Sequence, residues 1–218
     1  MSSNSSIGWI AERLRRLDFV VSAAAVDESL VAVERREMSA VQIVCVRIDP
    51  LDAATLTSAS TRYPNARFVL NIPKSARSTG DAYDVAKQLG ISFGGLGDAM
   101  RALREEDPGD YVYPQTTFVE RIFRQHSKIK GFERLDDSRY QLDRYGLPSV
   151  VVFVSEEYEV TAESVRLAIE RYGEFDAFVT SNPHALEISP EALSAGEEAG
   201  RKVYRWREFM SAVRKPWN

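Results

Sequence analysis

Short apolar runs of strand length alternate with helical patterns along most of the chain, and this alternation restricts the possible folds more than any other feature. The segments "AVQIVCVRI" at 40–48 and "SVVVFVS" at 149–155 are rich in valine and isoleucine, as strands covered on both faces are. A segment with apolar residues at helical spacing follows each of them. Strands and helices that alternate in this way predict an α/β fold built on a mostly parallel sheet.

The same patterns predict the individual elements. In the first half we expect a helix at 6–18, strands at 18–26, 29–37, 40–48, 66–73 and 91–95, and helices at 51–63, 80–90 and 98–106. In the second half we expect strands at 149–155, 175–183 and 201–206, and helices at 161–173, 189–200 and 207–213. Between the halves, a helix at about 117–128 and a hairpin that turns at 136–138 interrupt the alternation.

This order predicts two similar βαβαβα halves with a helix-plus-hairpin insert between them. Residues 1–105 form an α/β half with a preceding helix and β-hairpin, residues 106–147 form the linker and insert, and residues 148–218 form the second half. At an offset of 110 residues five residues recur, at Pro73 and Pro183, Ala82 and Ala192, Gly90 and Gly200, Met100 and Met210, and Ala102 and Ala212. The recurrence favours an internal duplication, although any two strand–loop–helix units of similar length would align about as well.

The composition excludes several classes of protein. The formal net charge is −4, so no global basic field attracts nucleic acid or an anionic membrane, and any such contact needs a local patch. With one cysteine, Cys45, and two histidines, His126 and His184, we predict no disulfide, no structural metal and no cofactor. The amino terminus lacks an apolar stretch typical of a signal peptide, so we expect a cytoplasmic chain without a membrane partner.

The loop at 74–79 is the first candidate site. Lys74, Arg77, Ser78 and Thr79 lie between an expected strand and the start of an expected helix. Ligands of open α/β sheets bind at the carboxyl ends of strands, and free amides at a helix start hold anions. The loop therefore predicts a site for a small anion or nucleotide. The alternative is that Ser78 and Thr79 only cap the helix.

A basic stretch at 121–144 is the second candidate. Its cations are Arg121, Arg124, Lys128, Lys130, Arg134, Arg139 and Arg144, against five nearby carboxylates. A helix followed by a charged hairpin could lie along the phosphate backbone of DNA or RNA. The alternative is an ordinary solvated helix and surface hairpin.

The amino-terminal segments give a third candidate. A helix with Glu12 is followed by a strand, an acidic turn with Asp27, a second strand and the run "IVCVRI". This order, over roughly residues 6–103, resembles the core of the restriction-endonuclease-like family. The resemblance implies a metal-dependent nuclease in which two carboxylates hold Mg²⁺ and a lysine, here replaced by Arg47, lies near the attacking water.

The residues at 45–47 depart from that family's pattern. Its Glu-x-Lys motif is replaced by Cys-Val-Arg. Cysteine offers no hard oxygen ligand, and arginine is too firmly protonated to act as a base. We therefore expect Glu12, Asp27 and Arg47 to be the remains of a catalytic site, without Mg²⁺ or nuclease activity.

Three functions of different class follow. The leading hypothesis is a non-catalytic nucleic-acid-associated protein from a restriction or antiviral defence setting, with a degenerate nuclease-like core and the basic stretch as its interface. The second is a module that binds a small anion or nucleotide at 74–79. The third is an interaction protein that assembles with a partner chain or as a homodimer.

Overall fold

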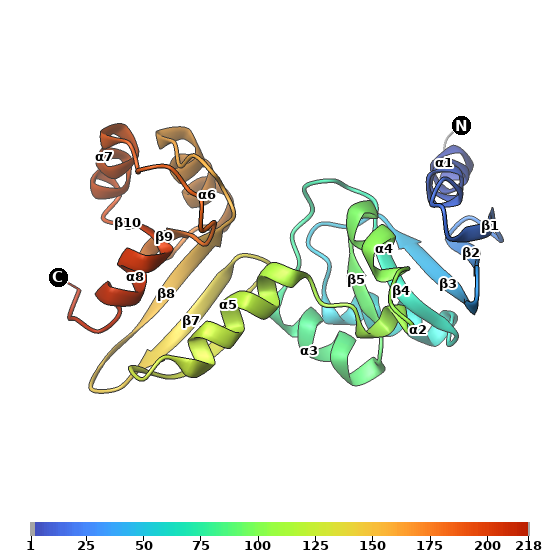
Figure 1. Cartoon of the computed structure of the whole chain (residues 1–218), viewed down its shortest axis with the longest axis horizontal. Coiled ribbons are helices and arrows are strands. Elements are labelled where there is room, and N and C mark those ends of the chain that lie inside the picture. The colour runs from blue at the N-terminus through green and yellow to red at the C-terminus, as the bar shows by residue number, and fades with distance from the viewer. Residues whose placement is uncertain (1–2, 218) are drawn as a thin grey trace. The chain divides into compact units, whose positions relative to one another are not determined.

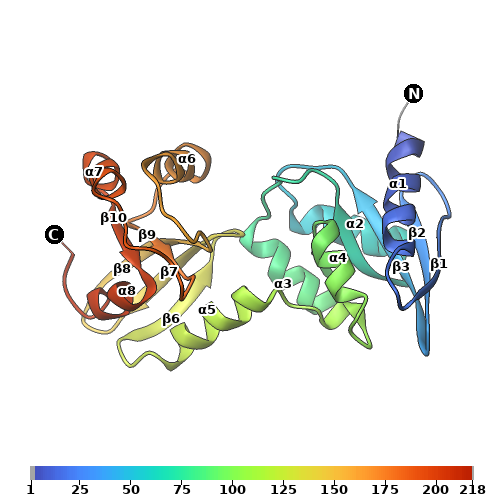
Figure 2. The same cartoon turned by 45° about the horizontal axis from the view of Figure 1, so that its top comes forward.

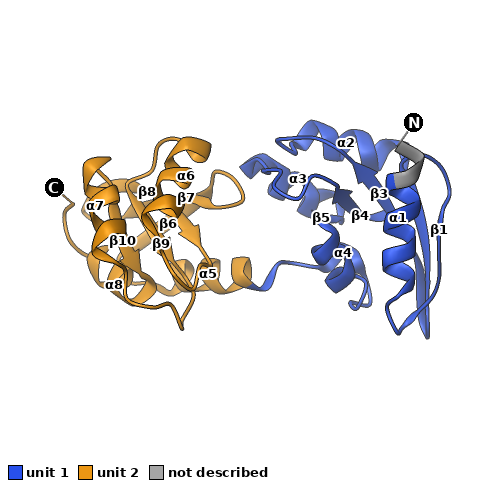
Figure 3. Ribbon diagram, turned by 90° about the horizontal axis from the view of Figure 1, so that it is seen from above, with its two compact units in different colours: residues 1–114 blue, residues 115–218 orange. Residues whose placement is uncertain are grey.

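The chain forms two compact units, Met1–Pro114 and Gln115–Asn218 (Figure 3). This computed structural model describes residues 3–217, and the side chains from Ser6 to Trp217. The boundary after Pro114 differs from the expected division at 105 and 147, because the expected insert belongs to the second unit. We describe each unit by itself.

The first unit begins with a helix, continues with three strands and then alternates helices with strands (Figure 1). Its elements are α1 (Ser3–Arg15), β1 (Val20–Ala25), β2 (Leu30–Arg35), β3 (Met38–Val46), α2 (Ala53–Arg62), β4 (Ala66–Asn71), α3 (Gly80–Leu89), β5 (Ser92–Gly94), α4 (Leu96–Ala102) and the short 3-10 turn η1 (Pro108–Asp110). The strands follow the order β1-β2-β3-β4-β5 across one sheet.

This sheet is mixed and not mostly parallel as expected. β1 pairs with β2, and β2 with β3, in antiparallel fashion, whereas the β3–β4 and β4–β5 pairs are parallel. The difference follows from the connections. Short turns join β1, β2 and β3 and force the chain to reverse, whereas helices α2 and α3 cross over between the parallel strands.

Helices cover both faces of the first sheet. Ile43 and Phe68 face α1 and α4, whereas their neighbours Val44 and Val69 face α2 and α3. Successive side chains of a strand point to opposite faces, so the near-continuous apolar run of β3 supplies both layers. The sequence pattern of a doubly covered strand is confirmed.

The second unit has the same kinds of element. They are α5 (Pro114–Gln125), β6 (Ile129–Arg134), β7 (Arg139–Arg144), β8 (Leu147–Ser155), α6 (Ala162–Tyr172), β9 (Ala177–Thr180), α7 (Pro190–Glu198), β10 (Lys202–Arg205) and α8 (Trp206–Ala212). The sheet order is β10-β9-β8-β7-β6, with antiparallel β6–β7 and β7–β8 pairs and parallel β8–β9 and β9–β10 pairs. α5 and α8 cover one face, and α6 and α7 the other.

The hairpin expected as an insert is an integral part of this second sheet. It turns at 136–138, as the sequence predicted, but β7 then pairs with β8 along its whole length. Tyr140 and Leu142 of β7 are buried in the core with Val150 and Val152 of β8. Because these alternate side chains leave water on folding, the hairpin cannot be a separate surface feature.

The helix starts predicted near residues 161 and 189 are confirmed. Thr161 caps α6 by accepting a hydrogen bond from the Ser164 N–H at 3.1 Å, and Ser189 caps α7, which begins with Pro190. Among the described residues, no helix combines the length and apolar character needed to cross a bilayer.

Candidate functional site

Glu12 lies on the exposed side of α1, where it pairs with neighbouring cations. Its carboxylate contacts Arg15, one turn along the helix, and lies 3.8 Å from Arg16 Nε. Ion pairs of this spacing stabilise a helix by a few tenths of a kcal/mol, about 0.2–0.5. Glu12 is thereby placed as a helix-surface residue.

Asp27 holds the turn between β1 and β2 and one end of α2. Its carboxylate accepts hydrogen bonds from the Ser29 N–H at 2.7 Å and from the Tyr63 hydroxyl at 2.8 Å. The Ser29 amide is the main cause that lowers the pKa of Asp27, and the Tyr63 hydroxyl adds to it. Both contacts fix local structure.

The residues at 45–47 give no catalytic group. Cys45 is buried in β3, and burial raises the pKa of its thiol to about 12. Arg47 lies exposed after the end of β3, where its Nη2 donates to Ser6 Oγ at 3.2 Å. Across residues 3–217, no group of three or more His, Cys, Asp or Glu side chains could hold a metal ion. The residues therefore do not fit the Mg²⁺ that the resemblance implies.

The loop at 74–79 is bonded to the segment that follows β3. Leu51 donates to the carbonyl of Arg77 and accepts from the amide of Thr79, both at 2.9 Å. The Arg77 backbone N–H also donates to Asp49 Oδ1 at 3.0 Å, and its guanidinium lies 3.5 Å from the same oxygen. A carboxylate thus occupies the place where an anion would meet Arg77.

The other members of this loop contribute little to a binding site. Thr79 precedes α3 without a side-chain capping bond, and its hydroxyl donates to the Leu51 carbonyl at 3.3 Å. Ser78 forms an isolated β-bridge with Leu51. Lys74 is exposed. The loop therefore ties the segment after β3 to the start of α3, and Lys74 is its exposed cation.

Two arginines of the basic stretch hold the β6–β7 turn together. Arg134 donates to the carbonyls of Asp136 at 2.9 Å and Asp137 at 3.2 Å. Arg139 donates to the Asp136 carboxylate at 2.7 Å and to the Glu174 carbonyl at 3.0 Å. Since their guanidinium groups are occupied within the unit, neither is well placed for a phosphate.

Arg144 is a buried structural residue. Only 6 % of it is exposed, and it donates to the carbonyls of Pro148 at 2.8 Å and Lys215 at 2.9 Å. Its partner at 215 lies just beyond α8, where carbonyls lack helical donors. Counting it among surface cations was therefore wrong.

The remaining four cations lie on the exposed side of α5 and along the start of β6. α5 lies against the β6–β7 hairpin (Figure 2). Its buried residues Val119 and Phe123 belong to the same core as Tyr140 and Leu142. Its opposite side carries Arg121 and Arg124, and the chain continues with Lys128 and Lys130. We call Arg121, Arg124, Lys128 and Lys130 the α5–β6 basic patch.

Arg124 differs from the other three members of the α5–β6 basic patch. It lies 2.5 Å from a Glu120 carboxylate oxygen and 5.3 Å from the centre of the Phe132 ring. Arg121, Lys128 and Lys130 are exposed and have no ion-pair partner among the described side chains. Unpaired cations need not give up an existing partner to bind a phosphate.

Comparisons with protein-family models, with curated proteins and with solved structures found no match to this chain. What defines its class is the architecture: an α/β protein with two five-stranded mixed sheets, each covered by helices on both faces.

Sequence reasoning missed a set of buried or turn-fixing polar residues. Arg35 is 5 % exposed and donates to four carbonyls, and Tyr172 donates to Asp137 at 2.7 Å. A signal was present, because Asp27, Ser29 and Arg35 recur as Asp136, Ser138 and Arg144 at an offset of 109. The recurrence from Pro73 to Ala102 has an offset of 110 and does not include these residues.

Proposed function

We propose that this chain is a non-catalytic nucleic-acid-associated protein whose core is a degenerate relative of the restriction endonucleases, with restriction or defence as its setting. The observation that carries the proposal is the α5–β6 basic patch. Three of its cations are exposed and unpaired among the described side chains, in a chain of net charge −4. Phosphate contacts of this kind bind nucleic acid without reading its sequence.

The order of elements supports a nuclease-like origin. In each unit a helix, three antiparallel strands, a helix and a strand parallel to the third follow one another, which is the order the resemblance implies. The absence of catalysis is supported by Cys45 and Arg47 at the positions of the Glu-x-Lys pair and by the contacts that occupy Glu12 and Asp27.

We also infer that the two units are copies of one ancestral unit. In support, strand pairing recurs at an offset of 109: Val20 faces Arg35 and Ser22 faces Glu34, as Ile129 faces Arg144 and Gly131 faces Asp143. The irregularity between the two pairs falls in the same place. Chance similarity of two α/β units would not be expected to reproduce a strand irregularity to the residue.

Side-chain contacts support the same inference. Asp27 accepts from the Ser29 amide at 2.7 Å, and Asp136 from the Ser138 amide at 2.9 Å. Tyr63 and Tyr172, again 109 residues apart, each donate to a carboxylate of the corresponding turn. Arg35 donates to the Glu105 carbonyl beyond α4, and Arg144 donates to the Lys215 carbonyl beyond α8.

Binding of fluorescently labelled double-stranded DNA, single-stranded DNA and RNA, measured by anisotropy over a range of salt, tests the proposed function. Each phosphate contact contributes about 0.9 to the slope of log K against log salt for duplex DNA and about 0.7 for single strands. The triple variant Arg121→Ala, Lys128→Ala, Lys130→Ala should lose up to three such contacts and bind correspondingly more weakly.

The control removes cations from the same unit but from other elements. Arg166→Ala with Lys202→Ala changes α6 and β10 and should leave the slope unchanged. Nucleic-acid binding that is absent, or that is equally strong in the triple variant, would refute the proposal. Cleavage of any of these substrates with Mg²⁺ or Mn²⁺ would refute its non-catalytic part.

A further inference from the structure

β1 is an edge strand without charged residues or proline, two of the usual protections of sheet edges. It pairs with β2 on one side and ends the sheet on the other (Figure 2). Its sequence, "VVSAAA", holds no charged residue, and Val21 and the following Val26 are 62 % and 59 % exposed. From Ser22 to Ala25 its pairing with β2 is regular. Such a strand presents unpaired N–H and C=O groups that another strand can join.

The other sheet edges are shorter or charged. β5 has three residues, and the η1 turn lies against it, with the Pro108 carbonyl accepting from Ser92 Oγ at 2.6 Å. β10 has four residues and carries Lys202 and Arg205. β6 has six residues but includes Lys130, Glu133 and Arg134. Short strands and charges are among the means by which natural edges avoid unwanted pairing. β1 has six residues and no charge, and its one pairing irregularity lies at its start, between Val20 and Ser22.

The contrast between β1 and β6 is residue for residue. At the offset of 109 fixed by the strand pairing, the exposed Val21, Ala24 and Ala25 of β1 correspond to Lys130, Glu133 and Arg134 of β6. Two edges with the same pairing therefore differ at two exposed positions, where Lys130 and Glu133 of β6 would oppose the approach of another strand and Val21 and Ala24 of β1 would not. The absence of charge on β1 is a property of its sequence and not of the fold.

We propose that β1 is a dimerisation edge, which pairs antiparallel with β1 of a second copy of this chain and joins two five-stranded sheets into one. In a two-fold antiparallel pairing residue i of one copy faces residue j of the other and j faces i, so a strand with charges of one sign would bring like charges together. β1 has none, and its alanines allow close approach. A partner recognised by charge would find no complement on this strand, which makes a second copy the occupant that fits it.

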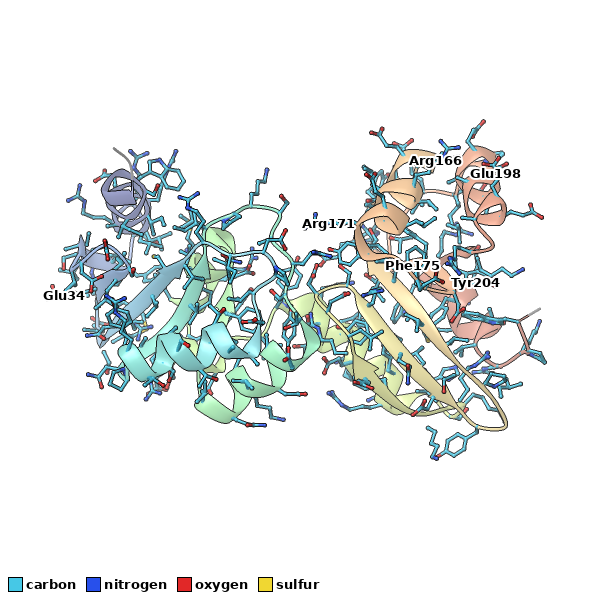
Figure 4. The ribbon with its side chains drawn as sticks, turned by 180° about the vertical axis from the view of Figure 1, so that it is seen from behind. Glu34, Arg166, Arg171, Phe175, Glu198 and Tyr204 are labelled. Atoms are coloured by element: carbon cyan, nitrogen blue, oxygen red, sulfur yellow. The ribbon has the colours of Figure 1, made fainter. Side chains whose placement is uncertain are left out.

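The nearest carboxylate on the neighbouring strand is already engaged. Glu34 of β2, labelled in Figure 4, accepts a hydrogen bond from Ser22 Oγ at 2.8 Å. Ser22 and Glu34 thus satisfy each other within one copy. The edge is left to contribute main-chain hydrogen bonds and small apolar side chains.

Sedimentation velocity on the full chain tests the proposal. We expect a species of twice the monomer mass that dissociates on dilution. Ala24→Glu, which places on β1 the residue that β6 has at the corresponding position, should return the chain to a monomer. The matched control, Glu133→Ala, makes the reverse change on β6 and should leave the dimer intact. Protection of Cys45 from thiol reagents checks that the first unit of Ala24→Glu is folded.

Cross-linking provides a second readout. Single cysteines introduced by Ser22→Cys, Ala24→Cys and Val26→Cys scan one face of β1, and at least one should form a disulfide-linked dimer under mild oxidation. Glu133→Cys on β6 should not. Cys45 does not compete because it is buried. A wild-type chain that stays monomeric at all concentrations, or a dimer that persists in Ala24→Glu, would overturn the proposal.

Discussion

Replacing Arg35 with methionine should remove the polar link between β2 and the chain segment beyond α4. The guanidinium donates to four main-chain carbonyls, those of Ser39, Leu103, Glu105 and Glu106, at 3.0, 3.1, 2.6 and 3.0 Å. The arginine is 5 % exposed, so methionine of similar length can fill the space but offers no donor. The variant therefore tests the hydrogen bonds more than the packing.

The magnitude follows from what the carbonyls lose. A hydrogen bond from a charged donor contributes about 1.5–3 kcal/mol, but four such values cannot be added here. Of the four bonds, the one to the Leu103 carbonyl is fully buried, so the other carbonyls can reach water in the variant. Methionine also avoids the desolvation that lowers the pKa of Arg35. A buried acceptor that is left without a donor costs about 1–3 kcal/mol, and with one such carbonyl we expect a loss of about 2 kcal/mol.

The chain offers a separate probe for each unit. Cys45 lies buried in β3, so its labelling by a thiol reagent in urea reports unfolding of the first unit. Trp206 and Trp217 belong to the second unit, and their fluorescence reports that unit once Trp9 has been replaced by phenylalanine. Arg35→Met should lower the urea midpoint of Cys45 labelling, whereas Arg144→Met should lower that of the tryptophan signal.

Arg36 supplies the matched control. It follows Arg35 directly but is exposed, so Arg36→Met should change the free energy of unfolding by no more than about 0.5 kcal/mol. If Arg35→Met and Arg36→Met have the same small effect, the carbonyl contacts do not stabilise the unit as argued. If each buried-arginine variant shifts both probes equally, the two units do not unfold independently.

Two further predictions concern a tyrosine and a turn. Burial, aided by the hydrogen bond to Asp137, raises the pKa of Tyr172 to about 12; because the unfolded value is about 10, this stabilisation is complete below pH 10 and is lost as the pH rises to about 12. Tyr172→Phe should flatten that part of the stability curve, with tyrosinate absorbance as the check. Glu37 and Gly146 occupy corresponding turns with φ of 59° and 69°; Glu37→Gly should stabilise and Gly146→Ala destabilise, each by about 1 kcal/mol in thermal unfolding. Changes of the opposite sign would refute either argument.

The sequence predicted the elements better than their arrangement. Apolar spacing located the helices and strands, and the acidic turn at 136–138 located the β6–β7 hairpin, because these signals are local. Membership of a sheet is not local. Tyr140 and Leu142 alternate as in any half-buried hairpin, and only their pairing with β8 shows that they complete a core.

The candidate sites were harder to predict because charge was counted without geometry. Arg134, Arg139 and Arg144 contribute to a basic stretch in the sequence, but in the structure they bond to carbonyls and to Asp136. Arg77 likewise lies beside Asp49, which is remote from it in sequence. A buried or paired arginine has the same letter as an exposed one, so composition alone overstates a phosphate-binding surface.

If the units are copies, function should be sought where they differ. The recurrent residues, such as Arg35 with Arg144 and Tyr63 with Tyr172, bond within each unit and maintain the fold. The corner formed by the first helix and first strand has changed instead: at the same offset, Glu12 and Val21 correspond to Arg121 and Lys130. In the first unit the strand of this corner, β1, is uncharged and suited to pairing with a second β1. In the second unit the corner carries Arg121 and Lys130 and is suited to binding phosphate. Selection that acted only on stability would not be expected to change the same corner in two different directions, so each corner is the place to test for its own partner.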